Sequence, residues 1–488
     1  MVKSTDGSTT LGRLPGDRTH PSAPTPPVSP VPDYARLFGP DAPTNRRTPP
    51  PAVASKPFFP DDSGDGSEVD TAFGGGNSGN LTNLGIQARG RQIQGEPGLS
   101  YITLNNTGSG FVEKFLLYAP VLLVGQRAPV LVVFHRYGVS EWDAYYYTSF
   151  FEEARRRGWF LLAPRAMSQK SFNRLEGQIN VEAALGFLNQ SYNVDLNRVY
   201  AVGFSMGGGL ATSYAARHVD PNGMMFAALV NHTGTVSQGD AWSSEYQDEA
   251  SNQLETAYGG TPADHPFNYQ RCSVIDIDHA TGLIGTGTDM GRNMTHLPIR
   301  NWMANNDPMQ YLRNQTTAFD TYLNGEAVNT TLTIVDGNVH SWSTLDETVV
   351  CDWLSQFSLQ LPRLANTLAD QDGNYFWWQV SQTTSGTFTP FSWYLDSVAN
   401  RISLYNTANL DQVSIDATAA GLQYATTLKI NLTTSDGTGD KILLTNMTAP
   451  PLSVTRDGLA ASGTWDPTTN TFLVTETQGN LHQWRLNF

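Results

Sequence analysis

Short apolar runs alternate with helix-length amphipathic runs along the middle of this 488-residue chain. Residues 130–135 (VLVVFH) form a β-branched, continuously apolar run, as expected of a strand that is covered on both faces. Repeated alternation of such runs with helical ones favours an α/β fold with a mostly parallel sheet and helices on both faces. Right-handed crossovers then bring the carboxyl ends of the strands to one edge, where sites form.

The same patterns predict the individual elements of this α/β unit, which we expect to span residues 96–362. Strands are expected at residues 101–104, 114–118, 130–135, 160–163, 198–204, 225–230, 298–303 and 330–335, the first two as a hairpin. Helices are expected at residues 142–157, 178–192, 207–218, 309–324 and 346–359.

The N-terminal part of the chain lacks both patterns. The first sixty residues hold 14 of the 28 prolines, and an acidic stretch and then a glycine-rich stretch follow them. Because proline lacks an N–H group and fixes φ, this composition cannot form a helix or a sheet interior. We therefore expect residues 1–95 to be a disordered or loosely docked tether, with anchoring to a wall or a partner as the alternative.

After Pro362 the pattern changes to short strand-like runs separated by turn signals such as SDGTGD. This pattern predicts a small antiparallel β-sandwich of roughly seven strands over residues 363–488. Five tryptophans in this part either form an exposed row that contacts a carbohydrate or polymer surface, or pack in the core; they are Trp377, Trp378, Trp393, Trp465 and Trp484.

Residues 203–207 read Gly-Phe-Ser-Met-Gly and lie between an expected buried strand and an expected helix. In a G-x-S-x-G nucleophile elbow the serine occupies a strained turn, and the glycines let neighbouring backbone approach without Cβ clashes. Ser205 is then placed at the strand end, beside the positive end of the following helix. The motif in this context indicates a nucleophilic serine.

A serine hydroxyl is a poor nucleophile unless a base takes its proton. His340 follows the expected strand 330–335 and fits the chain order serine, acid, histidine. His296 precedes its strand and His482 lies in the terminal unit, so both fit less well.

The acid that orients the imidazole is expected at another strand end. Asp307 follows the expected strand 298–303 and precedes a proline, which also makes it a good helix cap. Asp336 is the second candidate, and Asp278 and Asp289 rank lower.

The oxyanion of an acyl-transfer intermediate needs preorganised N–H donors. Met206, the residue after the serine, is expected to supply one of them. The second should come from residues 135–138 (His-Arg-Tyr-Gly), where we favour the N–H of Tyr137 and keep Arg136 as the alternative.

Aromatic residues near these positions are candidates for contacting substrate. Trp142 and the tyrosines after it offer flat amphipathic faces suited to aromatic or polymer acyl groups, although aromatics on a helix also form cores. Trp342 and Trp242 are further candidates, and the side chain of Arg136 either forms a salt bridge or reaches a substrate acid.

The separation between Ser205 and Asp307 exceeds what one or two β-α units require. It predicts an insertion over residues 235–296, either a cap over the site or a long surface loop. Cys272 and Cys351 either pair as a disulfide in an oxidising compartment or remain two separate buried thiols.

The stretch QSYNVDLNRVYAVGFSMGGGLATSYAARH resembles α/β-hydrolase esterases of the polyhydroxybutyrate depolymerase and feruloyl esterase kind. His340-Ser341-Trp342 resembles their Gly-His-x-Trp ending, and VLVVFHRYG resembles their strand ending in His-Gly. The Ser-Met-Gly-Gly-Gly run is also similar to cutinase-like polyester hydrolases, in which a Tyr or Phe backbone shares the oxyanion hole with the Met; Tyr137 matches that role. The likeness covers about residues 100–360, and Arg136 departs from it by standing where these families carry glycine.

The resemblance implies an α/β-hydrolase that cleaves esters through an acyl-enzyme. It leaves aliphatic polyesters, aromatic polyesters and aryl esters on polysaccharide open as substrates. A prolyl-oligopeptidase-type serine peptidase is the first alternative, although we identify no substrate-amine anchor and no large gating domain. A non-catalytic binding protein on the same fold is the second.

Composition and charge argue against two further classes, nucleic-acid-binding proteins and membrane-spanning proteins. A formal charge of −15 without a basic block provides no footprint for nucleic acid. No apolar run approaches the roughly 18 residues needed to span a bilayer. We expect no metal and no cofactor, and we expect the protein to be secreted or extracytoplasmic even though no signal peptide is visible.

Overall fold

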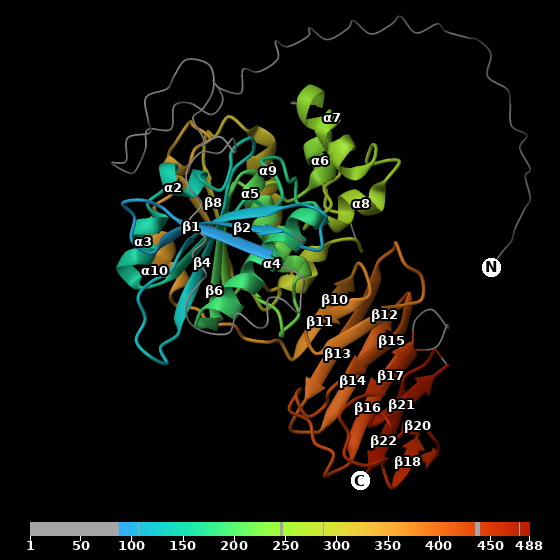
Figure 1. Cartoon of the computed structure of the whole chain (residues 1–488). Helices are drawn as coiled ribbons and strands as arrows, with labels where there is room; N and C mark the ends of the chain where they lie inside the picture. Colours follow the sequence, from blue (N-terminus) through green and yellow to red (C-terminus); the bar gives the residue numbers. More distant parts are fainter. Residues whose placement is uncertain (1–86, 106, 245–246, 286, 435–439, 478) are drawn as a thin grey trace, which may run out of the picture.

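The structure is a computed structural model that describes residues 87–105, 107–244, 247–285, 287–434, 440–477 and 479–488 (Figure 1). Most of the expected tether, residues 1–86, therefore lies outside the described residues. Its last part forms strand β1 (Gln87–Gln92), which pairs antiparallel with β2 (Leu99–Asn105) and so belongs to the sheet.

The first part of the described chain is built on a nine-stranded sheet in the order β1-β2-β3-β5-β4-β6-β7-β8-β9. Its remaining strands are β3 (Glu113–Tyr118), β4 (Ala128–Phe134), β5 (Phe160–Pro164), β6 (Val194–Phe204), β7 (Ala228–His232), β8 (Ile299–Ala304) and β9 (Thr330–Val335). The six strands β5, β4, β6, β7, β8 and β9, in sheet order, run parallel to one another, whereas β1, β2, β3 and the β3/β5 boundary pair antiparallel. The prediction of a mostly parallel sheet is confirmed.

Helices cover both faces of this sheet. They are α2 (Asp143–Tyr147), α3 (Phe150–Arg157), α4 (Leu175–Ser191), α5 (Met206–Arg217), α9 (Gln310–Gly325) and α10 (Glu347–Leu354). Along β4, Val130, Val132 and Phe134 share a buried cluster with α4, α5 and α9, while Leu131 and Val133 join α2, α3 and α10. This alternation is what a strand buried on both faces requires, because successive side chains point to opposite sides.

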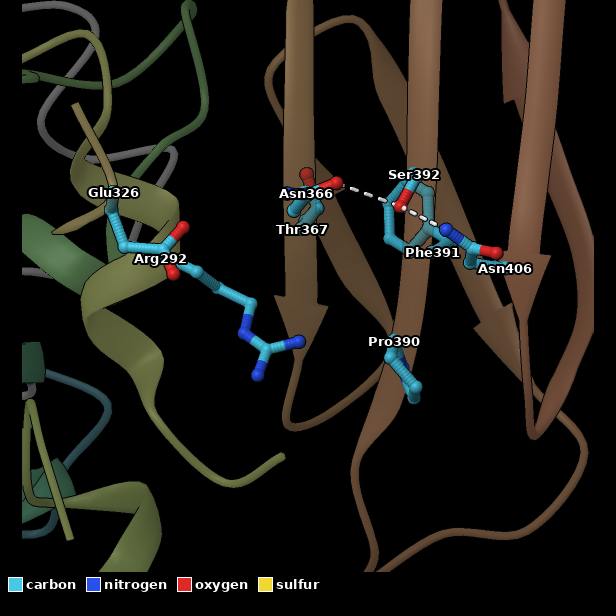
Figure 2. Close-up of a pocket in the computed structure, with 8 residues that line it drawn as sticks. All are labelled: Arg292, Glu326, Asn366, Thr367, Pro390, Phe391, Ser392 and Asn406. Atoms are coloured by element: carbon cyan, nitrogen blue, oxygen red, sulfur yellow. Dashed lines mark hydrogen bonds between the residues drawn. The ribbon is translucent and has the colours of Figure 1, made fainter. Parts of the chain in front are cut away.

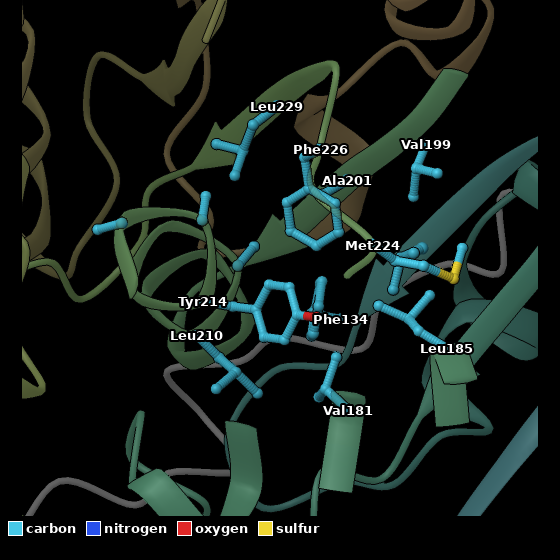
Figure 3. Close-up of a cluster of buried hydrophobic side chains, with 14 of the residues drawn as sticks. Phe134, Val181, Leu185, Val199, Ala201, Leu210, Tyr214, Met224, Phe226 and Leu229 are labelled. Carbon is cyan, nitrogen blue, oxygen red and sulfur yellow. The ribbon is translucent and has the colours of Figure 1, made fainter. Parts of the chain in front are cut away.

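Figure 3 shows part of the cluster on the first of these faces. The ring of Phe226 lies 6.4 Å from that of Phe134 on β4 and 5.1 Å from that of Tyr214 on α5. All three side chains are buried, so α5 is packed firmly against the sheet directly after the strand that precedes Ser205.

One expected helix is broken in the structure. Residues 142–157 form α2 and α3 rather than one helix, because Thr148 is extended with φ −135° and ψ 165°. Its hydroxyl donates to the carbonyl of Ala144 and accepts from the N–H of Phe150, so the same side chain ends one helix and begins the next.

The expected insertion, residues 235–296, lies between β7 and β8 and is largely helical. It contains α6 (Gln238–Trp242), α7 (Gln247–Tyr258), α8 (Pro266–Arg271) and the short 3₁₀ helix η2 (Met290–Met294). Helices α6, α7 and α8 share a small buried cluster that includes Cys272. Cys351, on α10, lies in a different cluster, and both cysteines are free thiols, so the disulfide considered from the sequence is not formed.

Two further sheets form the C-terminal part and enclose one apolar core. The first has the order β10-β13-β14-β16-β22-β18-β19 and the second β11-β12-β15-β17-β21-β20. Their strands are β10 (Leu364–Ala369), β11 (Gly373–Tyr375), β12 (Trp378–Gln382), β13 (Thr389–Asp396), β14 (Arg401–Thr407), β15 (Leu410–Ile415), β16 (Leu428–Thr434), β17 (Asp440–Leu444), β18 (Ser453–Arg456), β19 (Leu459–Ala460), β20 (Thr464–Asp466), β21 (Thr471–Glu476) and β22 (His482–Asn487).

This part differs from the expected antiparallel unit of roughly seven strands. Thirteen strands are found in the described residues, and the pairs β14/β16 and β15/β17 are parallel. Successive strands from β14 to β17 alternate between the two sheets, so every second strand returns beside its predecessor in the same direction. Trp378, Trp393 and Trp484 are buried in the shared core, which argues against the exposed row of five tryptophans.

A polar cleft of about 270 Å³ lies between the α/β part and the first C-terminal sheet (Figure 2). Arg292 extends from η2 toward the strands, where Ser392 on β13 donates to Asn366 on β10 and Asn406 donates to Ser392. On the C-terminal side, the cleft is therefore lined by polar side chains that hydrogen-bond to one another within the first C-terminal sheet.

A buried carboxylate joins the two parts. Asp370, directly after β10, accepts hydrogen bonds from Arg217 at 2.8 Å and from Arg271 at 2.6 Å. Burial opposes ionisation of this carboxyl, but attraction to the two guanidinium groups and their hydrogen bonds outweighs it and lowers the pKa of Asp370.

Replacing Asp370 with asparagine is expected to lower the free energy of unfolding by about 3–5 kcal/mol, because two largely buried cations lose their buried counter-ion. Since the folded pKa is lowered, the stabilisation is present above the unfolded-state pKa and is lost as pH falls through the folded one. Urea unfolding of the wild type and of Asp370→Asn should thus show a difference in unfolding free energy that becomes smaller in acid. Asp411→Asn, at an exposed pair with Lys441, is the matched control with a loss below about 1 kcal/mol; equal losses for the two variants would contradict the assignment.

No helix among the described residues is long and apolar enough to cross a membrane.

Candidate active site

Ser205 lies in a strained turn between β6 and α5. Its φ is 57° and its ψ is −123°, a conformation that residues with a side chain rarely adopt. A Cβ at Gly203 would lie 2.1 Å from the carbonyl oxygen of Gly207, and a Cβ at Gly207 would lie 2.4 Å from that of Phe134. Both glycines of the motif are therefore required by close backbone contacts, as a nucleophile elbow predicts.

Backbone hydrogen bonds hold this turn in place. The N–H of Ser205 donates to the carbonyl of His232 at the end of β7, and the carbonyl of Ser205 accepts from Gly208, Gly209 and Thr235. The serine is 5% exposed, so its hydroxyl lies just beneath the surface at the carboxyl ends of the strands.

His340 and Asp307 come together at the same edge of the sheet. Nδ1 of His340 lies 2.7 Å from Oδ2 of Asp307, and both side chains are buried. Oδ1 of Asp307 accepts from the N–H of Met309, the residue that precedes α9. The carboxylate therefore holds the turn before this helix and contacts the imidazole, but it is not the helix cap considered from the sequence, because the N-cap is Met309 and makes no side-chain cap bond.

The imidazole of His340 lies beside the residue that precedes the serine. Its ring centroid is 4.5 Å from that of Phe204, which also contacts the rings of His232 at 4.5 Å and Trp342 at 5.2 Å. These contacts bring the serine turn at the end of β6 and the loop after β9 to one point. An imidazole oriented by a carboxylate at that point can take a proton from a neighbouring hydroxyl.

The competing acids and histidines lie elsewhere. Asp336 is exposed and accepts from Asn305, and Asp278 and Asp289 accept from residues of the inserted segment. His296 packs edge-on against Phe376 of the C-terminal part, where burial lowers its pKa to about 4. His482 contacts Asp457, also in the C-terminal part.

The loop of residues 135–138, here called the oxyanion loop, follows β4 and contacts the segment that follows β5. Nε2 of His135 lies 3.0 Å from the carbonyl of Arg165, and Gly138 donates to the carbonyl of Gln169. The ring of Tyr137 lies 5.5 Å from that of Phe172. Met206 is the first residue of α5, so its N–H is among those that a helix leaves without an intrahelical acceptor.

Three side chains expected to contact substrate are buried. Trp342 is 0% exposed, Trp142 is stacked between Tyr101 and Tyr146, and Arg136 forms an ion pair with Asp143 at 3.2 Å. Packing of this kind leaves no face for a ligand, so in this conformation the three residues support the loops of the site rather than line it.

The inserted segment contacts the oxyanion loop. The hydroxyl of Tyr137 donates to Gln253 on α7 at 2.7 Å, and the hydroxyl of Tyr258, at the end of α7, donates to the carbonyl of Phe172. Trp242, half-buried on α6, donates its indole N–H to Glu255. Helix α7 thus contacts both the oxyanion loop and the segment that follows β5.

Two residues of the site were not singled out from the sequence. His232 supplies the carbonyl that holds Ser205, and burial, with the nearby His340, lowers its pKa well below the usual value. Its position at the end of the strand after the elbow is the signal that could have identified it. Asp143 contacts both Arg136 and Trp342. The only signal in the sequence that could have identified it is a carboxylate among apolar neighbours in an expected helix.

Among the described residues, no group of three or more His, Cys, Asp or Glu side chains is arranged to hold a metal ion.

No protein-family model and no curated protein matches the chain. Among solved structures it is similar to an S-formylglutathione hydrolase from Agrobacterium tumefaciens, at 15% identity over 55% of this chain and 97% of that one, with a TM-score of 0.42. It is also similar to a ferulic acid esterase, at 14% identity over 55% and 96% of the two chains, with a TM-score of 0.38. A further similarity is to the acylaminoacyl peptidase of Pyrococcus horikoshii, at 14% identity over 56% and 40%, with a TM-score of 0.36.

Proposed function

We propose that this chain is a serine carboxylic ester hydrolase of the α/β-hydrolase fold, in which Ser205 is the nucleophile, His340 the base and Asp307 the acid that orients it. The observation that carries the proposal is the 2.7 Å contact between His340 and Asp307, placed beside the strained turn that presents Ser205. Each of the three lies after a different strand, at one edge of a mostly parallel sheet.

The proposed reaction has two halves. The oxygen of Ser205 bonds to the ester carbonyl carbon while its proton passes to Nε2 of His340, and the alcohol then leaves with that proton. Water attacks the acyl-enzyme by the same route and restores the serine. Asp307 holds Nδ1–H of the imidazole, which fixes the tautomer with Nε2 available as the base and stabilises the imidazolium.

Stabilisation of the oxyanion is assigned to the N–H groups of Met206 and Tyr137. The first lies at the start of α5, where the helix dipole favours negative charge. The second lies in the oxyanion loop, whose path is held by the contacts of His135, Gly138 and the Tyr137 ring. Both assignments need only backbone groups and follow the resemblance to polyester hydrolases.

The proposed substrates are polyesters, aryl esters or polysaccharide esters. A secreted enzyme that degrades such substrates fits a chain in which a β unit is attached to the α/β part. The segment 235–296 is proposed as the cap that shapes the acyl site, because α7 contacts the oxyanion loop. An exposed row of tryptophans is not part of any polymer contact that the C-terminal part makes, because Trp378, Trp393 and Trp484 are buried there.

Hydrolysis of a panel of soluble p-nitrophenyl esters, aliphatic and aromatic polyester films, feruloylated polysaccharide and peptide p-nitroanilides tests the proposal. We expect turnover of soluble esters, release of acid from at least one polymeric or aryl ester, and rates on peptide anilides at least a hundredfold lower. Faster cleavage of the anilides than of the esters would favour a serine peptidase. Absence of turnover with every substrate of the panel would favour a binding protein.

A further inference from the structure

We infer that Asp143 is a positioning residue that ties the oxyanion loop to the loop carrying His340. The inference rests on the proposed function, because it concerns the alignment of the two loops that would act on the same substrate atoms. Asp143 opens helix α2 and is 0% exposed.

On one side Asp143 holds the oxyanion loop. Its Oδ2 accepts from the backbone N–H of Arg136 at 3.2 Å, and its Oδ1 lies 3.2 Å from Nε of the Arg136 guanidinium. Arg136 immediately precedes Tyr137, whose N–H is the proposed second oxyanion donor. The carboxylate thereby fixes both the backbone and the side chain of the residue next to that donor.

On the other side Asp143 holds the loop of the base. The indole N–H of Trp342 donates to the same Oδ2 at 2.8 Å. Trp342 lies two residues after His340, and its ring packs edge-on against Phe150 and at 5.2 Å from Phe204, which precedes the serine. One buried oxygen therefore accepts from a loop that follows β4 and from a loop that follows β9.

The same contacts explain why an arginine can occupy position 136. Esterases that this chain resembles carry glycine at its position, and an unpaired buried guanidinium so close to the site would be costly. Here the cation is paired with Asp143 and stacks 4.7 Å from the ring centroid of Tyr147. Arg136 is consequently held within the protein, where it fixes the loop instead of reaching a substrate acid.

Accurate spacing of these loops matters because the base and the oxyanion donors serve the same carbonyl group. A misplacement of about 1 Å can cost roughly 10²-fold in rate. One oxygen of Asp143, Oδ2, accepts both from the N–H of Arg136 and from the indole N–H of Trp342. The amide oxygen of an asparagine can take the same place and keep both bonds, so an alanine, which has no side-chain acceptor, is the change that breaks the connection.

The test is Asp143→Ala in the full-length chain, assayed with a soluble p-nitrophenyl ester. We expect kcat to fall roughly 10²-fold with KM within about twofold of wild type, because the loops lose alignment while the acyl site keeps its walls. Trp342→Phe removes the indole N–H together with part of a buried ring, and it should lower kcat in the same direction. In the Asp143→Ala background it should add little to the loss of kcat, because both changes remove the same connection.

Asp440→Ala is the matched control. Asp440 is also 0% exposed, but it accepts from Thr407 within the C-terminal part, so its loss should lower Tm and leave kcat unchanged. A folded Asp143→Ala variant with wild-type kcat overturns the inference, as do effects of Asp143→Ala and Trp342→Phe that simply multiply. If Asp143→Ala does not fold, Trp342→Phe with wild-type kcat overturns it.

The failure of this inference is distinguishable from that of the proposed function. A wild-type protein that hydrolyses no ester and takes no fluorophosphonate at Ser205 defeats the proposed function. An active wild type beside an equally active Asp143→Ala variant defeats only the role of Asp143.

Discussion

Ser205→Ala is expected to lower kcat for soluble esters by roughly 10⁶-fold, since removing the nucleophile of a serine hydrolase costs about that much. The alanine keeps Cα and Cβ in the strained turn, whose hydrogen bonds are all made by backbone groups. The fold and KM should therefore change little, and the loss should appear almost wholly in kcat. Initial-rate kinetics with p-nitrophenyl esters, together with Tm, measure both quantities.

A surface serine provides the comparison. Ser355, at the end of α10, is exposed and donates only to a backbone carbonyl, so Ser355→Ala should keep full activity. Ester turnover by purified Ser205→Ala within tenfold of wild type would mean that another group attacks the ester.

Asp307→Asn is expected to lower kcat by roughly 10⁴-fold, the cost seen when the acid of such a triad becomes an amide. Oδ1 of Asp307 accepts from the N–H of Met309, which should keep the amide oxygen on that side. The NH₂ group then faces Nδ1 of His340, which must accept rather than donate. In that tautomer Nε2 carries the proton and cannot take one from the serine.

Asp336→Asn separates this effect from a general loss of charge near the histidine. Asp336 lies four residues before His340 but is exposed and accepts from Asn305. Its variant should retain nearly all activity, measured as kcat/KM across the pH range in which the ester is stable. A larger loss for Asp336→Asn than for Asp307→Asn would reverse the assignment of the acid.

Much of the fold could be predicted because its signals are local. The continuous apolar run of β4 and the strand–turn–helix context of Ser205 each depend on residues close together in the sequence. The juxtaposition of Asp307 with His340 followed from topology, since parallel strands end at one edge of the sheet.

Other features depend on contacts between distant segments, for which the sequence carries no local signal. Strand β1 lies in a segment that composition marked as a tether, and it is set by pairing with β2. The indole N–H of the buried Trp342 donates to Asp143, 199 residues away. The parallel pair β14/β16 arises because the intervening strand belongs to the opposite sheet, which short turn signals do not reveal.

Labelling with a fluorophosphonate tests most directly whether Ser205 is an activated nucleophile. The wild-type chain should gain the mass of one phosphonyl group, and peptide mapping should place it on Ser205, with labelling slowed strongly in Asp307→Asn and absent in Ser205→Ala. A native, folded wild-type protein that gains no label, or gains it on a different residue, would contradict the account.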